Sequence, residues 1–265
     1  MSLTALSQAR EDARFRIFNY VTELSADEGD DQDSRGLFAI SWEHRQLAIC
    51  RLLQDGDSAA FQLGLRRSGL TWLHLLTRMA KGMQAAPSLR LGSTWDCVAS
   101  AIAAGDLKLA QQIADRFPGE PDLEREYLDD YMPLAMMSRL VRAPDDRASI
   151  EALGQRWEQA EDGSSTDDIP LWMALADRDI PAFQEAFSAV IERRRGQMVA
   201  YRKSPGGLPT TAATEGTIYI DGLAILQLAQ SLGMNITTSF GLCPKVARVS
   251  SVHTELPNNS WMAFD

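Results

Sequence analysis

The chain has few cysteines, and their placement excludes a disulfide-bonded fold. Only three occur in 265 residues, at Cys50, Cys97 and Cys243, far apart and odd in number. A disulfide framework needs pairs, and no two of these cysteines have the close spacing of a zinc site. We therefore expect a protein of a reducing compartment that binds no metal and no cofactor.

Long apolar runs are also missing. The longest purely apolar run covers six residues, 171–176, whereas roughly 20 are needed to cross a bilayer. The first residues, "MSLTALSQAREDARF", lack the apolar centre of a signal peptide. The sequence therefore predicts a soluble cytoplasmic protein with no membrane partner.

Positive charge is in short supply. Against 36 Asp and Glu residues stand 26 Lys and Arg, for a formal net charge of −10. Nucleic-acid binding needs clustered cations, so the balance argues against a nucleic-acid partner. Five basic residues do occur in 193–203, where the end of a helix is the simpler interpretation, since its dipole favours cations. The acidic surface either serves solubility or attracts a basic partner.

Catalytic signatures are absent as well. The sequence contains no phosphate-binding loop, no dinucleotide glycine fingerprint and no G-x-S-x-G elbow. His44, His74 and His253 share no local motif, so each is expected to be structural or exposed. We predict that the protein is not an enzyme; a scattered site using His44, His74 or Cys97 stays open as an alternative.

What the sequence does contain is helical periodicity over most of its length. Apolar residues recur at helical spacing in the N-terminal part, for example Leu3, Leu6, Phe15 and Phe18 in the first segment. The polar segment 25–34 is expected to be a loop. We predict a mostly all-α fold in a single domain, residues 1–265, with a possible division into 1–86 and 87–265; the first three helices are expected at 3–24, 35–57 and 58–81.

A recurring aspartate marks the start of three helices. Asp57, Asp106 and Asp179 are each followed by Phe or Ala four residues later and by Gln five residues later. An aspartate at this position caps a helix by accepting a backbone N–H, and its charge suits the positive end of the dipole. Gly105 is a suitable helix stop before Asp106. Because the spacing is unequal, the pattern predicts an irregular array of antiparallel helical hairpins.

The remaining segments are assigned by the same local signals. Ser93 or Thr94 is expected to cap the helix before Gly105, Pro121 to open a helix, and Pro133 to kink or divide it. The apolar stretch 219–233 predicts a central buried helix. We expect polar loops at 158–170 and 204–217, and at 236–240 either a short β-like strand or an extended C-terminal tail across the helices.

An acidic cluster lies in "EPDLEREYLDDY", residues 120–131. Carboxylates steer an encounter with a basic protein, and tyrosines supply anchoring area. A solvated helix face is the alternative. The residues predicted to bind a partner are Glu120, Asp122, Glu124, Glu126, Tyr127, Asp129, Asp130 and Tyr131.

Three segments together resemble the immunity protein 49 family of bacterial polymorphic toxin systems. They are "WDCVASAIAAGDLKLAQQIAD", "IPLWMALADRDIPAFQEAFSAVIERRRGQM" and "EGTIYIDGLAILQLAQSLGMNI", within residues 93–240. Helical immunity proteins against PoNe-type nuclease toxins have a similar pattern. The resemblance implies an all-α antitoxin that binds and neutralises a cognate secreted toxin, and the toxin expected is a basic nuclease. A helical-repeat adaptor for another protein or peptide is the alternative, and the oligomeric state is left open.

Overall fold

The computed structural model describes residues 3–24, 30–160, 165–248 and 255–264. Over these ranges the chain forms eleven α-helices, four short 3-10 turns and no β-strand, which confirms the predicted all-α class. The α-helices are α1 (Leu3–Leu24), α2 (Asp30–Asp55), α3 (Ser58–Ala80), α4 (Cys97–Ala103), α5 (Leu107–Ala114), α6 (Leu128–Arg142), α7 (Arg147–Glu158), α8 (Ile169–Asp177), α9 (Ile180–Lys203), α10 (Pro209–Ala213) and α11 (Ile220–Ser231). The 3-10 turns are η1 (Pro87–Arg90), η2 (Gly92–Thr94), η3 (Lys245–Arg248) and η4 (Ser260–Met262).

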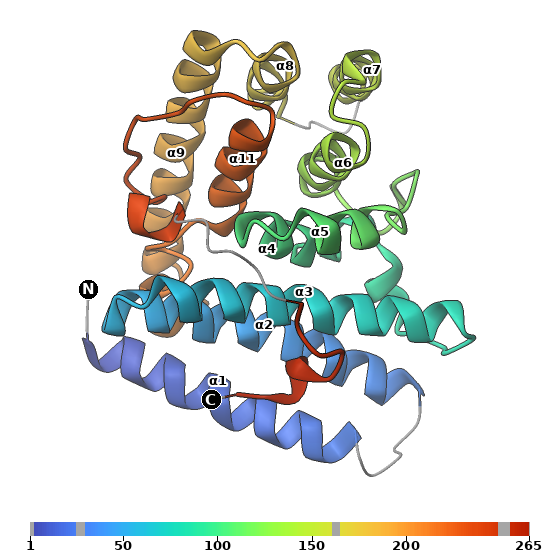
Figure 1. Cartoon of the computed structure of the whole chain (residues 1–265), viewed down its shortest axis with the longest axis vertical. Coiled ribbons are helices and arrows are strands. Elements are labelled where there is room, and N and C mark those ends of the chain that lie inside the picture. Colours follow the sequence, from blue (N-terminus) through green and yellow to red (C-terminus); the bar gives the residue numbers. More distant parts are fainter. Residues whose placement is uncertain (1–2, 25–29, 161–164, 249–254, 265) are drawn as a thin grey trace.

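The helices are stacked in layers (Figure 1). The long helices α1, α2 and α3 run antiparallel along one side, with α2 packed against both of the others. The short helices α4 and α5 lie on α3, and α11 lies on α4. Helices α6 to α9 complete the opposite side of the molecule (Figure 1).

A chain of aromatic rings links these layers through the core. Phe38, Trp72 and Trp95 meet edge to face, with centroids 5.9 and 5.8 Å apart. Trp95 then contacts Phe117, and Phe117 contacts Tyr131, at 5.5 and 5.4 Å. Such pairs add about 0.5–1.5 kcal/mol each beyond the apolar area they bury. The rings come from α2, α3, the loop before α4, the turn after α5, and α6, so the core is continuous across these segments.

The predicted aspartate caps are confirmed. Asp57, Asp106 and Asp179 each accept a hydrogen bond from the backbone N–H three residues later, at 2.8, 3.1 and 3.1 Å. Gly105 ends the preceding helical segment with φ of 74°, the left-handed region that glycine adopts without strain. Asp146 caps α7 in the same way, at 3.1 Å from Ser149 N. The local sequence therefore determines where these helices begin.

The prediction that Ser93 or Thr94 caps a helix is wrong. Gly92–Thr94 form the 3-10 turn η2, and α4 begins only at Cys97. The Thr94 hydroxyl donates to Leu91 O at 2.8 Å, so it serves the turn instead of a helix start. Asp96 precedes α4 without a side-chain capping bond. The Asp96 carboxyl is thus not used by the helix.

The N-terminal helices differ from the prediction at two points. Helix α2 begins at Asp30, so residues 30–34 are helical and not part of a loop; residues 25–29 lie outside the described ranges. In α1, Phe15 and Phe18 are exposed, whereas small residues such as Ala9 and Ala13 are buried. Close packing of α1 on α2 selects the small residues for the interface.

Four expectations for the second half are corrected. Pro121 lies in the loop before α6 and opens no helix, and Pro133 lies inside α6 and does not divide it. The predicted loop 204–217 contains the short helix α10. The tail has only an isolated bridge between Phe240 and Cys243 in place of a strand. Trp261, in the described part of the tail, is buried against the core. This agrees with the alternative prediction, an extended tail that lies across the helices.

Other expectations are confirmed. Helix α11 is buried over nearly its whole length and packs on α4. The basic run 193–203 ends α9 at Lys203. The segment between Glu158 and Ile169 connects α7 to α8, and its residues 161–164 lie outside the described ranges. The possible division of the chain at residue 86 stays a prediction.

Candidate functional sites: an acidic loop and a charged cleft

The acidic cluster lies mostly on a loop and not on a helix face. Residues 119–127, here called the acidic loop, connect the turn after α5 to the start of α6 and loop outward beside α6 (Figure 1). The backbone closes a turn in which Arg125 N and Glu126 N both donate to Asp122 O, at 2.8 and 2.9 Å. The predicted alternative of a solvated helix face is therefore replaced by a structured loop.

Two of the predicted partner-binding residues hold this loop from inside. The Glu126 carboxylate accepts hydrogen bonds from Ser93 N at 2.7 Å and from Asp122 N at 2.8 Å. Tyr131 is only 1% exposed, and its hydroxyl donates to Pro118 O at 2.8 Å. Glu126 and Tyr131 therefore shape the loop but do not face an incoming partner.

The other side chains of the loop point outward. Tyr127 is 78% exposed and Leu123 is 63% exposed. Glu124 is exposed beside them, and Glu120 is paired with Arg156 at 2.5 Å. Leu123 was not among the residues predicted from the sequence, because a single leucine in an acidic segment carries no periodic signal. Tyr127 and Leu123 are thus two exposed large apolar side chains on a loop rich in carboxylates.

Asp129 and Asp130 occupy the first turn of α6, where the helix dipole favours them. Both oxygens of Asp129 are used: it accepts from Trp157 Nε1 at 3.0 Å and from Ser165 N at 3.0 Å. Asp130 makes no side-chain hydrogen bond or ion pair within the described chain, and burial raises its carboxyl pKa. Asp129 thus braces the start of α6, while Asp130 is available.

A charged cleft of about 310 Å³ opens beside Asp130. It lies between α6, α8, α9, the start of α11 and the residues before α4. We call it the charged cleft; its ionisable lining comprises Asp96, Asp129, Asp130, Asp168, Asp221, Arg193, Arg194 and Tyr219. Arg193 is paired with Asp168 and also contacts Asp167 at 3.7 Å.

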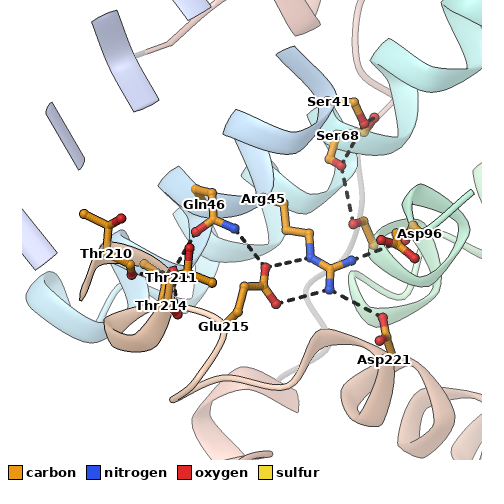
Figure 2. Close-up of polar contacts among 11 residues, drawn as sticks. Ser41, Arg45, Gln46, Ser68, Asp96, Thr210, Thr211, Thr214, Glu215 and Asp221 are labelled. Carbon is orange, nitrogen blue, oxygen red and sulfur yellow. Dashed lines mark hydrogen bonds and ion pairs between the residues drawn. The ribbon is translucent and has the colours of Figure 1, made fainter. Parts of the chain in front are cut away.

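Behind the cleft, a buried arginine organises three acidic residues (Figure 2). Arg45 on α2 makes two bonds to Glu215, at 2.9 and 3.2 Å, and a third to Asp221 at 3.5 Å. Its guanidinium also donates to the backbone oxygen of Asp96 at 3.5 Å. Glu215 accepts a further bond from Gln46 at 2.9 Å. The arginine therefore joins α2 to the segments that begin α4 and α11.

Burial sets the ionisation of the groups around this arginine. The pKa of Asp96 is raised to about 7, chiefly because burial disfavours the carboxylate; Arg45 opposes the shift and Asp221, Glu215 and Asp130 add to it. Burial also raises the pKa of the Tyr219 hydroxyl. The Arg194 guanidinium lies over the Tyr219 ring, 5.2 Å from its centroid, which favours the cation.

His44 and His74 contact Trp261, and the three cysteines are buried. His44 Nε2 is 2.6 Å from Trp261 O, and the His74 ring lies against the Trp261 ring with centroids 5.0 Å apart. Burial raises the pKa of the Cys97 thiol well above its usual value, which opposes a reactive thiolate. His253 lies outside the described residues. Within the described residues, no three His, Cys, Asp or Glu side chains are grouped to hold a metal ion.

The sequence interpretation missed the buried polar network entirely. The signal was present in Glu43, His44, Arg45 and Gln46, four consecutive polar residues between the apolar stretches 37–40 and 47–50. All four are buried. Consecutive residues face every side of a helix, so this run meant that α2 is enclosed by neighbours on all sides. Identifying the acidic partner would still have required the fold.

Comparison with known proteins adds no relative: no family model, curated protein or solved structure matches the chain. None of the helices in the described ranges has the length and apolarity to traverse a bilayer.

Proposed function

We propose that this protein is an immunity protein, which binds one basic protein toxin and neutralises it by covering the toxin's active site. The observation that carries the proposal is the exposed pair Tyr127 and Leu123 on a fixed loop rich in carboxylates. Apolar and aromatic anchors surrounded by charge are the features of a protein-binding surface. The resemblance to helical immunity proteins supports the same class of partner.

The loop is built to keep its shape when a partner binds. Glu126 and Tyr131 fix its backbone from within, so little conformational freedom is lost on association. The net charge of −10 favours rapid encounter with a cationic protein. Toxin domains that act on nucleic acid carry clustered cations for phosphate contacts, and such a surface would complement this one.

The first experiment is co-expression with a candidate toxin encoded by a neighbouring gene. We expect the protein to restore growth of cells that express the toxin and to co-purify with it. If the protein neither restores growth nor co-purifies with the toxin, the proposal is wrong. Capture of several unrelated proteins, with no rescue, would favour a general helical adaptor instead.

The second experiment locates the surface. Leu123→Ala combined with Tyr127→Ala should weaken toxin binding at least about 100-fold, the effect of losing a central anchor. Leu208→Ala removes a comparably exposed side chain, 58% exposed, from another part of the surface and should leave binding unchanged. Glu124→Lys should slow association more than the control Glu185→Lys on α9. Equal binding by the anchor variant and the Leu208 control would remove the acidic loop from the interface.

A further inference from the structure

We propose that the charged cleft binds a free α-amino acid with an apolar side chain, holding its ammonium group at Asp96 and Asp130 and its carboxylate at Arg194. This binding activity is separate from the proposed interaction with a toxin. It rests on which charges in the cleft are satisfied and which are left over.

Most charges of the cleft are paired within the protein. Arg193 is paired with Asp168, and Asp221 with Arg45. Asp129 accepts hydrogen bonds from Trp157 and Ser165. These residues form the frame of the cleft and leave little charge for a ligand.

Three charged side chains of the cleft stay without such a partner. Over the described ranges, no hydrogen bond or ion pair involves the carboxylates of Asp96 and Asp130, and no carboxylate pairs with Arg194. Arg194 is held over the Tyr219 ring, and its Nε, which is buried, has no acceptor. Two acidic groups and one guanidinium in one cavity match the opposite charges of a small zwitterion.

The remaining lining selects the size and polarity of the ligand. Leu134, Met137, Leu171, Val190 and Ile225 supply apolar walls. A volume of about 310 Å³ is at the small end of ligand pockets, which span roughly 300–1,000 Å³. Leucine, methionine and phenylalanine combine both charges with an apolar side chain of suitable size.

The test is calorimetric titration of the purified full-length chain with L-leucine, L-methionine and L-phenylalanine. We expect at least one to bind with a Kd of about 1 mM or tighter. For the best of them, the N-acetyl derivative lacks the ammonium group and the amide lacks the carboxylate, so each should bind at least about tenfold more weakly. The proposal would be overturned if none of the three amino acids binds. It would also be overturned if both derivatives bind as tightly as the parent amino acid.

Two variants assign the charges. Arg194→Gln should weaken binding about tenfold or more and abolish the preference for the amino acid over its amide. Asp130→Asn should weaken binding and abolish the preference over the N-acetyl derivative. Arg195→Gln and Asp145→Asn make the same chemical changes at residues paired with Glu192 and Arg178 outside the cleft, and should bind as wild type does. If Arg194→Gln folds and keeps the full preference for the free carboxylate, the assignment is wrong.

Discussion

Arg45 and Glu215 lie 170 positions apart in the chain and form a two-point ion pair in the interior, at 2.9 and 3.2 Å. Their side chains are only 6% and 4% exposed. The pair joins α2 to the segment that leads into α11 (Figure 2), and Arg45 also contacts Asp96 and Asp221, which line the charged cleft. Both the stability of the fold and the position of Asp221 and Asp96 therefore depend on it.

Removal of one partner should be strongly destabilising. Arg45→Met leaves the Glu215 carboxylate buried without its cation, and breaking such a pair costs about 3–5 kcal/mol. Combining Arg45→Met with Glu215→Met should recover much of that loss, because no charge is then left unpaired. Urea unfolding measures both. The exposed pair of Arg147 and Asp177 is the control, and Arg147→Met should change the free energy of unfolding far less than Arg45→Met does.

The three capping aspartates should contribute different amounts to the free energy of unfolding, although each caps its helix in the same way. Asp57→Ala and Asp179→Ala each remove one capping bond, for a loss of about 1 kcal/mol. Asp106→Ala should cost more, because Asp106 also pairs with the largely buried Arg66 at 2.8 Å. Thermal and urea unfolding of the three variants give the order. Equal losses at all three positions would mean that the ion pair adds nothing.

Gly92 should tolerate no side chain, for reasons of space alone. A Cβ there would lie 2.4 Å from the Tyr131 ring and 3.1 Å from Phe117. Gly92→Ala must displace the ring that closes the aromatic chain, at a cost of about 1–3 kcal/mol. Gly119→Ala is the matched control, since nothing lies within 4 Å of a Cβ at that position. An unchanged melting temperature for Gly92→Ala would show that Tyr131 moves freely.

Asp96 should make stability depend on pH. Its folded pKa of about 7 exceeds the usual value of 3.8, so the folded state holds its proton more tightly than the unfolded state. The contribution of the protonated carboxyl is present at low pH, falls as pH rises from about 4 to 7, and is lost above 7. Asp96→Asn lacks this loss, so its stability relative to wild type should increase across that interval and level off above it.

Unfolding in urea at a series of pH values, for wild type and Asp96→Asn in parallel, measures the difference. Ionisable groups that do not interact with Asp96 titrate alike in both proteins, so their contributions cancel in the comparison. A difference that is constant with pH would contradict the raised pKa of Asp96.

The acidic loop shows why a site is only partly predictable. The carboxylates and tyrosines of residues 120–131 were visible as a cluster in the sequence. Which of them face outward depends on Ser93 and Pro118, whose backbone groups bind Glu126 and Tyr131. The segment can be identified from its composition. Which of its side chains are buried depends on contacts with residues that precede it in the chain.

By itself, the sequence determined the all-α class, the three aspartate-capped helix starts, the stop at Gly105 and the buried helix α11. These follow from interactions within a few residues of one another and from the 3.6-residue period. The tertiary structure alone decided that Arg45 meets Glu215, that Asp96, Asp130 and Arg194 border one cleft, and that Phe15 and Phe18 stay exposed. Such relationships depend on how distant helices pack, and local sequence carries no record of which faces will meet.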